Sequence, residues 1–274
     1  MVKAVRHLGE GQREFQKIFD RLCERKYAWQ AWSDFVEMTA ISIANSCEIR
    51  PEVKRDREER WRAIVSDYTR KELELFPQML AVLVAALERS DEQDFLGEMF
   101  MALELGNHWK GQFFTPYSVC KAMANITAED AGEKVKGKGF AAVCDPACGA
   151  GATLIAARNR LAQAGIGGSQ AWFVGQDIDR TAAMMCYVQL SLLGCAGYVV
   201  VADTLNNPVA GNLLWPTARD GQDIWFLPMS FMDPAWVIRL GRAWRRSEEP
   251  YFVPGTEPVP ELTICDGSGQ FMLF

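Results

Sequence analysis

Residues 140–157, FAAVCDPACGAGATLIAA, contain a short apolar run, a glycine-rich turn and an Ala/Leu-rich segment in unbroken succession. The run Phe140–Cys144 is typical of a parallel strand that is buried on both faces, and residues 153–164 are typical of a helix. Gly149 and Gly151 lack the Cβ atoms that would keep a ligand away from the backbone, and the N–H groups of a helix's first turn can bind a polar group. The stretch therefore predicts a strand, a turn and a helix that together bind a nucleotide-like ligand.

The acid at the end of the predicted strand indicates which ligand suits this turn. The dinucleotide-binding fingerprint has a third glycine where this chain has Leu154, so that fingerprint is matched only in part. Asp145 would repel a pyrophosphate, but it suits a ligand that carries positive charge. S-adenosylmethionine is such a ligand, and its ribose diol requires a second acid at the end of the next strand, where Asp177 follows the apolar run 171–175. The alternative is a turn whose glycines serve packing only.

Two motifs resemble those of the adenine-N6 DNA methyltransferases, above all the modification subunits of type I restriction systems. Residues 145–151, DPACGAG, resemble the DPACGSG loop of that family, and residues 111–116, GQFFTP, resemble its G-Q-[FY]-[FY]-T-P segment. The two motifs occur in the family's order and at family-like spacing, and the similarity covers roughly residues 90–205. The resemblance implies an S-adenosylmethionine-dependent DNA methyltransferase, specific for adenine N6, in a restriction-modification system.

The resemblance also implies which residues contact the cofactor. They come from the GQFFTP segment, the glycine loop and the ends of two further strands, and they are Gln112, Phe114, Thr115, Pro116, Asp145, Pro146, Ala147, Gly149, Gly151, Asp177, Ile178 and Asp203. Asp203 follows the apolar run Tyr198–Val201 and occupies the position that reads the adenine amino group of the cofactor in such enzymes. Asp179 is the alternative to Asp177 as the ribose ligand, and a core position is the alternative for Phe113, Phe114 and Trp109.

The family's catalytic tetrapeptide, [NDS]-P-P-[YFW], is absent from this chain. In that tetrapeptide the first side chain and the following carbonyl accept the amino hydrogens of adenine, and the aromatic ring stacks on the flipped base. The most similar segment is DPAW, which makes Asp233, Pro234 and Trp236 the candidate catalytic residues. The segment stands in the correct order after the cofactor motifs.

Other observations argue against a catalytic role for this segment. Pro228 would break a central strand just before it, and too few residues follow it for a complete methyltransferase sheet. A chance surface turn is therefore the alternative for Asp233–Trp236. Asn207-Pro208 is a weaker candidate, because it lacks the second proline and the aromatic residue.

The sequence as a whole predicts an α/β fold, in which an incomplete Rossmann-like methyltransferase sheet follows an all-helical N-terminal region. Apolar residues recur at three- and four-residue spacing in residues 11–47 and 57–89, as in amphipathic helices. We expect a helical domain over residues 1–108 and a cofactor-binding α/β domain over residues 109–240. Residues 241–274 are expected to form a loop-rich tail.

Local signals place some helix boundaries in this scheme. Pro77 should end or kink a helix, and Ser90 or Asp91 should cap a helix that continues to Leu105. Residues 134–138 are expected to form a polar, Gly-rich connection into the first strand.

The charge balance argues against a protein whose whole surface binds DNA. The net charge is −6, whereas neutralisation of phosphates requires a local excess of Lys and Arg. The basic clusters 54–62 and 239–246 are candidates for such a local contact, and a solvated helix face is the alternative for both. We therefore expect DNA to be contacted through a partner, such as a specificity-type subunit, or through a homo-oligomer.

Composition also indicates the redox state of the cysteines, whether a metal site is expected, and the cellular location. The 8 cysteines lie among apolar neighbours and are expected to be reduced core residues. No metal site is expected, because C-x-x-C pairs are absent and only His7 and His108 could assist the cysteines. No apolar run reaches the length of a membrane span, and the first residues contain no signal core, so we expect a globular cytoplasmic protein.

Three functions remain open on this sequence. The first is an enzyme that methylates adenine N6 in DNA, completed by a partner chain. The second is a non-catalytic relative that binds S-adenosylmethionine as an interaction module in a restriction or mobile-element system. The third is a nicotinamide-dependent oxidoreductase, in which Asp145 and the GQFFTP segment would have no role.

Overall fold

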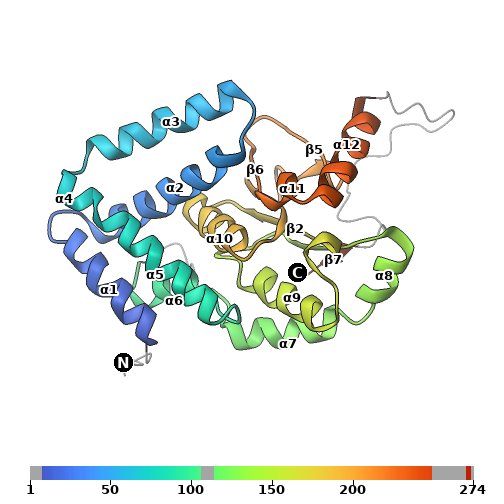
Figure 1. Ribbon diagram of the computed structural model, residues 1–274, viewed down its shortest axis with the longest axis horizontal. Helices are drawn as coiled ribbons and strands as arrows, with labels where there is room; N and C mark the ends of the chain where they lie inside the picture. Colours follow the sequence, from blue (N-terminus) through green and yellow to red (C-terminus); the bar gives the residue numbers. More distant parts are fainter. Residues whose placement is uncertain (1–7, 106–113, 249–269, 273–274) are drawn as a thin grey trace.

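A computed structural model describes residues 8–105, 114–248 and 270–272, which form a group of helices followed by a sheet with helices on both faces (Figure 1). The N-terminal helices α1 to α6 are Glu10–Leu22, Ala28–Cys47, Pro51–Ser66, Arg70–Leu73, Leu75–Arg89 and Phe95–Ala102. The helices α7 to α12 are Tyr117–Thr127, Ala131–Lys138, Ala152–Gln163, Arg180–Leu192, Met229–Met232 and Pro234–Glu248. The strands β1 to β7 are Ala141–Asp145, Ala171–Asp177, Ala196–Val201, Ala210–Gly211, Pro216–Thr217, Asp223–Phe226 and Gln270–Met272.

The main sheet has the strand order β6-β3-β2-β1-β7. Strands β1, β2 and β3 are parallel, with Ala141 opposite Ala171 and Trp172 opposite Ala196. Strand β7 adds parallel to the free side of β1, whereas β6 runs antiparallel to β3 at the other edge. The carboxyl ends of β1, β2 and β3 therefore lie along one edge of the sheet, where ligands of open α/β sheets bind. The predicted α/β fold with a helical N-terminal region is confirmed.

The N-terminal helices pack directly on the helices of the sheet. Helix α2 lies along α10, where Trp32 Nε1 donates to Met185 Sδ at 3.3 Å and the hydroxyls of Ser33 and Thr181 are 3.2 Å apart. One apolar core includes side chains from both parts of the chain. The division expected at residue 108 falls outside the described residues. No helix within the described ranges is long and apolar enough to cross a membrane.

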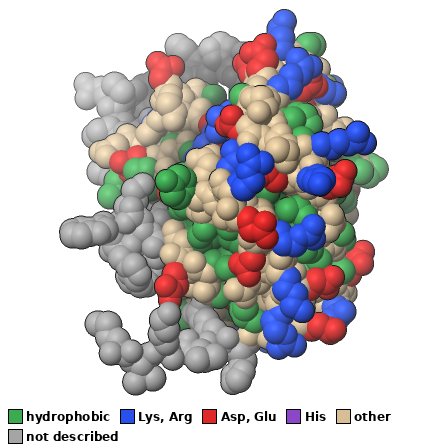
Figure 2. Space-filling model, turned by 90° about the vertical axis from the view of Figure 1, so that its left-hand side faces the viewer, with side chains coloured by type: hydrophobic (Ala, Val, Ile, Leu, Met, Phe, Trp, Pro, Cys, Tyr) green, Lys and Arg blue, Asp and Glu red, His purple; other side chains and the backbone are tan. Residues whose placement is uncertain are grey.

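Basic side chains of the cluster 54–62 on α3 contact other side chains of the protein. The Arg57 guanidinium lies 3.9 Å from the centre of the Trp225 ring, and Arg60 forms a 2.8 Å ion pair with Glu37 of α2. On the face that includes the N-terminal helices, acidic side chains are interspersed among basic ones (Figure 2). A paired helix face is therefore a better interpretation of this cluster than a phosphate-binding patch.

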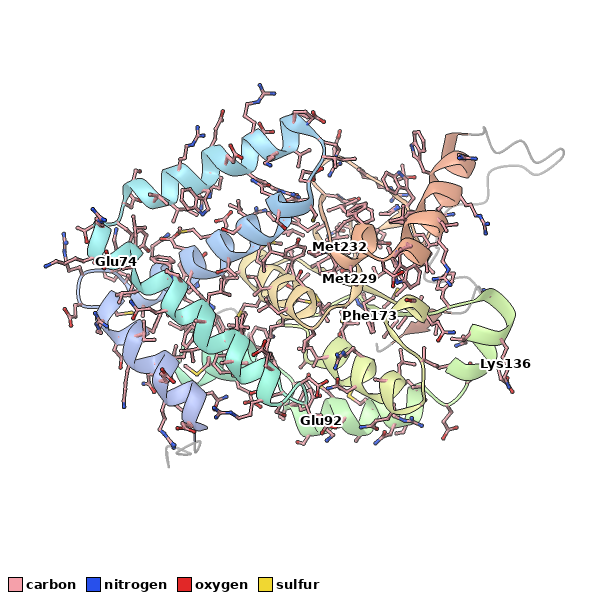
Figure 3. The ribbon with its side chains drawn as sticks, viewed as in Figure 1. Glu74, Glu92, Lys136, Phe173, Met229 and Met232 are labelled. Atoms are coloured by element: carbon pink, nitrogen blue, oxygen red, sulfur yellow. The ribbon has the colours of Figure 1, made fainter. Side chains whose placement is uncertain are left out.

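Successive residues of the central strands pack into two different cores, as the two-residue period of a strand requires. Val143 and Phe173 belong to the core shared with α9, α10 and the N-terminal helices, and Phe173 is labelled within the α/β part of the molecule in Figure 3. Trp172 and Val200 face the opposite side, into a core that α12 closes with Trp236. Both faces of these strands are covered, which explains why they are apolar throughout.

The start of α6 differs from the prediction. Asp94, and not Ser90 or Asp91, caps this helix, because its side chain accepts the Gly97 N–H at 2.9 Å. The helix also ends at Ala102, about one turn earlier than expected. All of these acids suit a first turn by type, so the sequence pattern alone could not select among them.

One further boundary was predicted wrongly, whereas another lies close to its predicted place. The helical run is interrupted at Glu74, between α4 and α5, and Pro77 lies within the first turn of α5, where its missing N–H has no helical acceptor to lose. Residues 134–138 lie within the helix α8 rather than in a connection, and Gly139, with φ +81°, ends that helix. Acidic Glu133 in its first turn and basic Lys138 in its last turn complement the helix dipole and offset its glycines.

The C-terminal part has more regular structure than expected. Residues 241–248 continue helix α12, in which Trp236, Leu240 and Ala243 recur at helical spacing and are all buried. Residues 270–272 form strand β7 against β1. The apolar positions of α12 face the sheet, so this helix is a layer of the fold and not a tail.

The predicted catalytic segment lies at the amino end of the sheet. Asp233 accepts a hydrogen bond from the Ser169 hydroxyl, and Trp236 Nε1 donates to the Gly168 carbonyl at 2.8 Å. Gly168 and Ser169 precede β2, and the length of this strand, about 20 Å, separates them from the carboxyl edge. Asp233, Pro234 and Trp236 therefore lie at the end of the sheet opposite to the glycine loop, and their catalytic role stays a prediction that this position does not favour.

Trp236 is a core residue of the layer beneath the sheet. Its ring is fully buried, and the ring centroids of Trp172 and Phe140 lie 4.8 Å and 5.5 Å from it. Arg239, one turn later on α12, covers the ring with its guanidinium at 4.5 Å. The aromatic residue that resembled a base-stacking group thus joins α12 to the sheet.

We predict that Trp236→Ala lowers the free energy of unfolding by about 3–5 kcal/mol, because it leaves a large cavity between α12 and the sheet. Val237→Ala is the matched control, since Val237 is the next residue of the same helix and is 46% exposed. This control should change the free energy of unfolding by less than about 1 kcal/mol. Urea denaturation measures both, and similar losses in the two variants would contradict the packing described for Trp236.

Candidate cofactor site

The ends of β1 and β2 are joined directly through the glycine loop, residues 145–151. Gly149 N donates to Asp177 Oδ2 at 2.8 Å, and Cys148 N donates to the Gln176 carbonyl at 3.0 Å. Both acceptors belong to the last two residues of β2. The loop that follows β1 is thereby held against the carboxyl end of the neighbouring strand.

The segment after β3 is attached to the same edge. The Thr204 hydroxyl donates to the Pro146 carbonyl in the glycine loop. The buried side chain of Gln176 donates to the Asn207 carbonyl at 3.0 Å and accepts the Val209 N–H at 3.0 Å. Three successive strand ends therefore meet in one hydrogen-bonded unit, as the sequence predicted for the cofactor edge.

Asp145, the last residue of β1, organises the glycine loop from within. Its side chain is 5% exposed, and its two oxygens accept the Ala147 N–H at 3.0 Å and the Thr153 hydroxyl. Burial raises the pKa of this carboxyl, and the charge of Asp177 raises it further. Each carboxylate oxygen has a second lone pair, so these bonds leave acceptor capacity for a cationic ligand. That contact with the cofactor stays a prediction.

The two glycines of the loop make room for neighbouring side chains. Gly149 has φ +52°, and a Cβ built there would lie 2.9 Å from the ring of Phe114. Gly151 has φ +96°, and a Cβ there would lie 2.9 Å from the sulfur of Cys186. The sequence analysis attributed these glycines to the close approach of a ligand. The structure shows that packing inside the protein also requires them.

Phe114 brings the GQFFTP segment to the loop, as the resemblance implied. Its ring also contacts Phe100 of α6, at a centroid distance of 5.4 Å. Thr115 and Pro116 follow at the surface, where Pro116 is the N-cap of α7, and both line a cavity of about 440 Å³. Gln112, another predicted cofactor contact, lies outside the described residues, as does Phe113.

Two acids follow one another at the entry to α10, and they have different roles. Asp177 accepts the Asp179 N–H at 2.8 Å with Oδ1, in addition to the Gly149 N–H on Oδ2, and burial raises its pKa. Asp179 caps α10 by accepting the Ala182 N–H at 3.0 Å. The alternative ribose ligand is thus occupied as a helix cap, whereas Asp177 lies at the loop itself.

Ile178 and Asp203 present solvent-accessible side chains at the same edge. Ile178 is 69% exposed, so its apolar side chain offers a surface for a flat ring. Asp203 is half-buried and accepts the Asn206 amide at 2.6 Å and the Leu205 N–H at 2.9 Å, and these bonds lower its pKa. Asp203 therefore remains ionised and open to a ligand.

These contacts fit a cationic ligand with a diol better than they fit a pyrophosphate. A phosphate-binding glycine loop offers its N–H groups to the ligand, whereas here Gly149 N–H donates to a carboxylate of the protein. Asp145, Asp177 and Asp203 place three acids at one edge, where they would repel phosphate charge. The methionine ammonium, the sulfonium and the ribose hydroxyls of S-adenosylmethionine match such an edge.

The glycine loop contains a buried thiol, that of Cys148. The cysteines of the described residues form no disulfide. Those residues also contain no cluster of three His, Cys, Asp or Glu side chains that could hold a metal ion. Cys148 in the glycine loop is buried against Cys186, which raises the pKa of its thiol.

Sequence reasoning missed two buried glutamines that hold this site together. Gln176 is 2% exposed and Gln189 is completely buried, and each makes three hydrogen bonds. A buried amide is costly unless it is paired. A glutamine within an apolar strand or helix was therefore a usable signal, and both residues stand in such segments.

A comparison with known sequence families agrees with the motifs. Residues 93–219 match the sequence family described as N-6 DNA Methylase. Among solved structures, the chain is similar to a protein from Listeria monocytogenes assigned as a class I S-adenosylmethionine-dependent methyltransferase. That similarity has 15% sequence identity and a TM-score of 0.38, and it covers 86% of this chain and 71% of the other. No curated protein matches the chain. N-6 DNA methylases use S-adenosylmethionine, so the predicted cofactor is the one that the matched family uses.

We predict that Gly149→Ala destabilises the protein more than Gly165→Ala does. Both glycines have positive φ, +52° and +78°, so each substitution costs about 1–2 kcal/mol in backbone strain. A Cβ at Gly165 meets nothing within 4 Å, whereas a Cβ at Gly149 meets the Phe114 ring. Urea denaturation of the two variants measures the difference.

The double variant Gly149→Ala/Phe114→Ala isolates that ring contact. If Phe114 packs on the loop, the double variant should lose less free energy of unfolding than the two single variants lose in sum, by at least about 0.5 kcal/mol. Additive losses would show that Phe114 does not pack on the loop.

Proposed function

Since residues 93–219 match the N-6 DNA methylase family, we propose that this chain is an S-adenosylmethionine-dependent DNA adenine-N6 methyltransferase of the restriction-modification type. The observation that supports the proposal most is the 2.8 Å bond from Gly149 to Asp177, which joins the glycine loop to the second strand end. Phe114 packs on the same glycine. The two motifs that resemble the family thus lie together at one edge.

In this proposal each strand end recognises a different part of the cofactor, which supplies an electrophilic methyl group when it is bound. Asp177 binds the ribose diol, and Asp203 binds the amino group of the adenine ring. Ile178 packs against that ring with its exposed side chain. Asp145 and Thr115 lie on the methionine side, where the buried carboxylate attracts the ammonium group.

The remaining predicted contacts shape the cleft around the methionine part. They are supplied by the GQFFTP segment and by the backbone of the loop, and they are Gln112, Phe114, Pro116, Pro146, Ala147, Gly149 and Gly151. Ala147 is exposed and Phe114 half-buried in the structure, so both can form the wall of a ligand site. The left-handed conformation at Gly149 keeps this wall in place.

The groups that bind the target adenine are proposed to come from a partner. Asp233, Pro234 and Trp236 lie at the wrong end of the sheet. Asn207 lies nearer the cofactor edge, but its side chain accepts Gln222 Nε2 at 3.1 Å and donates to the Asp220 carbonyl at 2.9 Å. We therefore propose that DNA is contacted through a specificity-type subunit or a second copy of the chain.

A second function is favoured by these same observations. The described residues include most of the proposed cofactor edge, whereas the segment that resembled a catalytic tetrapeptide is engaged in packing. A chain of this kind can bind S-adenosylmethionine without methylating DNA, as an interaction module. Both functions share the cofactor site and differ only in transfer of the methyl group.

We predict that S-adenosylmethionine and S-adenosylhomocysteine bind in a calorimetric titration and that NAD does not. Asp203→Asn should weaken binding about tenfold, because it removes a charged hydrogen bond to the cofactor. Asp220→Asn is the matched control, since Asp220 is an exposed acid in a nearby turn. Unchanged affinity in Asp203→Asn would remove this residue from the site, and binding of NAD would contradict the cofactor assignment.

We predict that the purified chain alone transfers few methyl groups to DNA, because no described residue is placed to localise the adenine lone pair. Co-expression with the products of adjacent genes, in cells that lack adenine methylation, should produce N6-methyladenine that depends on Asp203. Mass spectrometry of the DNA measures it. Persistent absence of N6-methyladenine beside intact cofactor binding would favour the interaction module over the enzyme.

A further inference from the structure

Gln189 connects the glycine loop to the N-terminal helices. It lies on α10, is fully buried, and donates through one amide nitrogen to the Ala150 carbonyl at 2.9 Å and to Asp94 Oδ1 at 2.7 Å. Its oxygen accepts the Leu96 N–H at 3.1 Å. One side chain thus satisfies backbone groups of both the loop and α6.

Asp94 is the other half of this connection. It caps α6 through Gly97 N–H and is 3% exposed, and burial raises its pKa to about 6. Two donors, from Gly97 and Gln189, converge on the same carboxylate oxygen. The start of α6 is therefore fixed relative to α10 by the residue that also contacts the loop.

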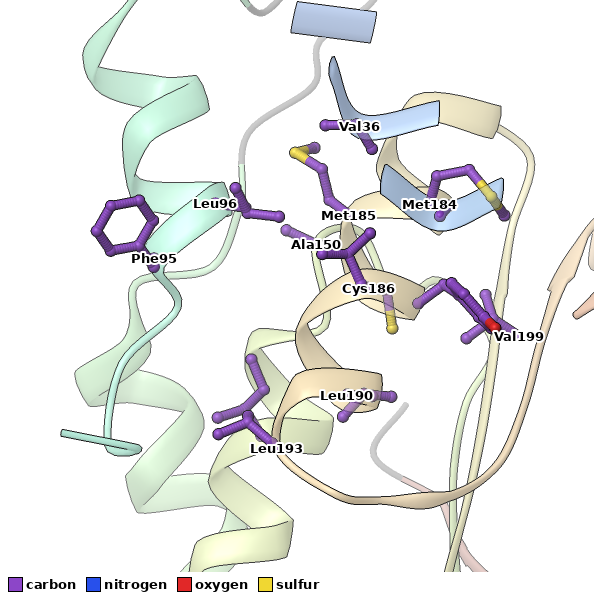
Figure 4. Close-up of a cluster of buried hydrophobic side chains, with 14 of the residues drawn as sticks. Val36, Phe95, Leu96, Ala150, Met184, Met185, Cys186, Leu190, Leu193 and Val199 are labelled. Atoms are coloured by element: carbon purple, nitrogen blue, oxygen red, sulfur yellow. The ribbon is translucent and has the colours of Figure 1, made fainter. Parts of the chain in front are cut away.

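The Ala150 carbonyl of the glycine loop lies in buried surroundings, where Gln189 is its hydrogen-bond donor. Ala150 is buried, so its carbonyl would be unpaired if Gln189 were removed. Leu96 of α6 and Cys186 of α10 lie beside Ala150 in the apolar cluster of Figure 4. Gly151 approaches Cys186 so closely that a Cβ would clash there. A loss of the amide should therefore change the loop conformation itself.

We propose that Asp94 and Gln189 are positioning residues that set the conformation of the glycine loop, so that the docking of α6 on α10 is a requirement for cofactor binding. This inference rests on the proposed cofactor site at the same loop. It makes the N-terminal helices part of that site, although these two residues touch no predicted ligand atom.

The test compares two buried amides that both join the N-terminal part to the α/β part. Gln189→Met removes the contact with Ala150 and keeps the length of the side chain. Asn159→Leu is the matched control, because Asn159 on α9 donates to the Asp91 carbonyl at 2.8 Å and contacts the Tyr117 hydroxyl at 3.0 Å, away from the loop. Both variants should lower the melting temperature.

The two variants should differ in the glycine loop. Hydrogen exchange of the amides in residues 147–151, measured without cofactor, should become at least tenfold faster in Gln189→Met and stay unchanged in Asn159→Leu. The affinity for S-adenosylmethionine should fall more than tenfold in the first variant and less than threefold in the second. Unchanged loop exchange in a folded Gln189→Met protein would overturn the inference.

Conservative replacement provides a second and milder test. Asp94→Asn keeps an oxygen that can accept both N–H groups, so its affinity for S-adenosylmethionine should stay within about threefold of the wild-type value. Asp94→Ala removes that oxygen, so the affinity should fall more than tenfold. Equal losses of affinity in Asp94→Asn and Asp94→Ala would contradict a positioning role that depends on the side-chain oxygen of Asp94 as an acceptor. If Gln189→Met does not fold, these two variants still decide the question.

The failure of the inference and that of the proposed function are distinguishable. If the wild-type chain binds no S-adenosylmethionine, the proposed function fails, while loop exchange in Gln189→Met without cofactor still tests the positioning role. If the wild type binds the cofactor and Gln189→Met binds it equally well, only the positioning role fails.

Discussion

The hydrogen bond from Gly149 N to Asp177 Oδ2 is the contact on which the architecture of the site depends. It holds the turn after β1 against the end of β2, and it requires the left-handed conformation that glycine adopts without strain. The turn is supported from within by Asp145 and from outside by Phe114. This edge is acidic, and the Gly149 N–H already donates to a carboxylate of the protein. The bond that stabilises the turn therefore also disfavours the binding of a phosphate.

Much of this edge could be predicted from the sequence, because it is encoded locally. An apolar run, two glycines and an acid within residues 140–157 placed β1 and α9 within about one residue of their observed bounds. The acids Asp177 and Asp203 follow apolar runs in the same way, and parallel strands bring such ends together.

The rest depended on contacts between distant parts of the chain. Asp233–Trp236 resembled a catalytic tetrapeptide, but a short segment does not reveal at which end of a sheet it lies, and the bond from Trp236 to Gly168 decides that. Asp94 and Gln189 are 95 positions apart in the sequence and meet only because α6 docks on α10. The pairing of residues 270–272 with β1 is equally remote from any local pattern.

The central claim is that the ends of β1, β2 and β3 form one site for S-adenosylmethionine. Hydrogen exchange of the wild-type chain, followed by mass spectrometry with and without S-adenosylmethionine, tests this claim most directly. Binding should slow the exchange of peptides that cover residues 145–151, 177–179 and 203–206 together, while peptides of α12 stay unchanged. Protection around Asp233 instead, or no protection at any of the three strand ends despite saturating cofactor, would contradict the account.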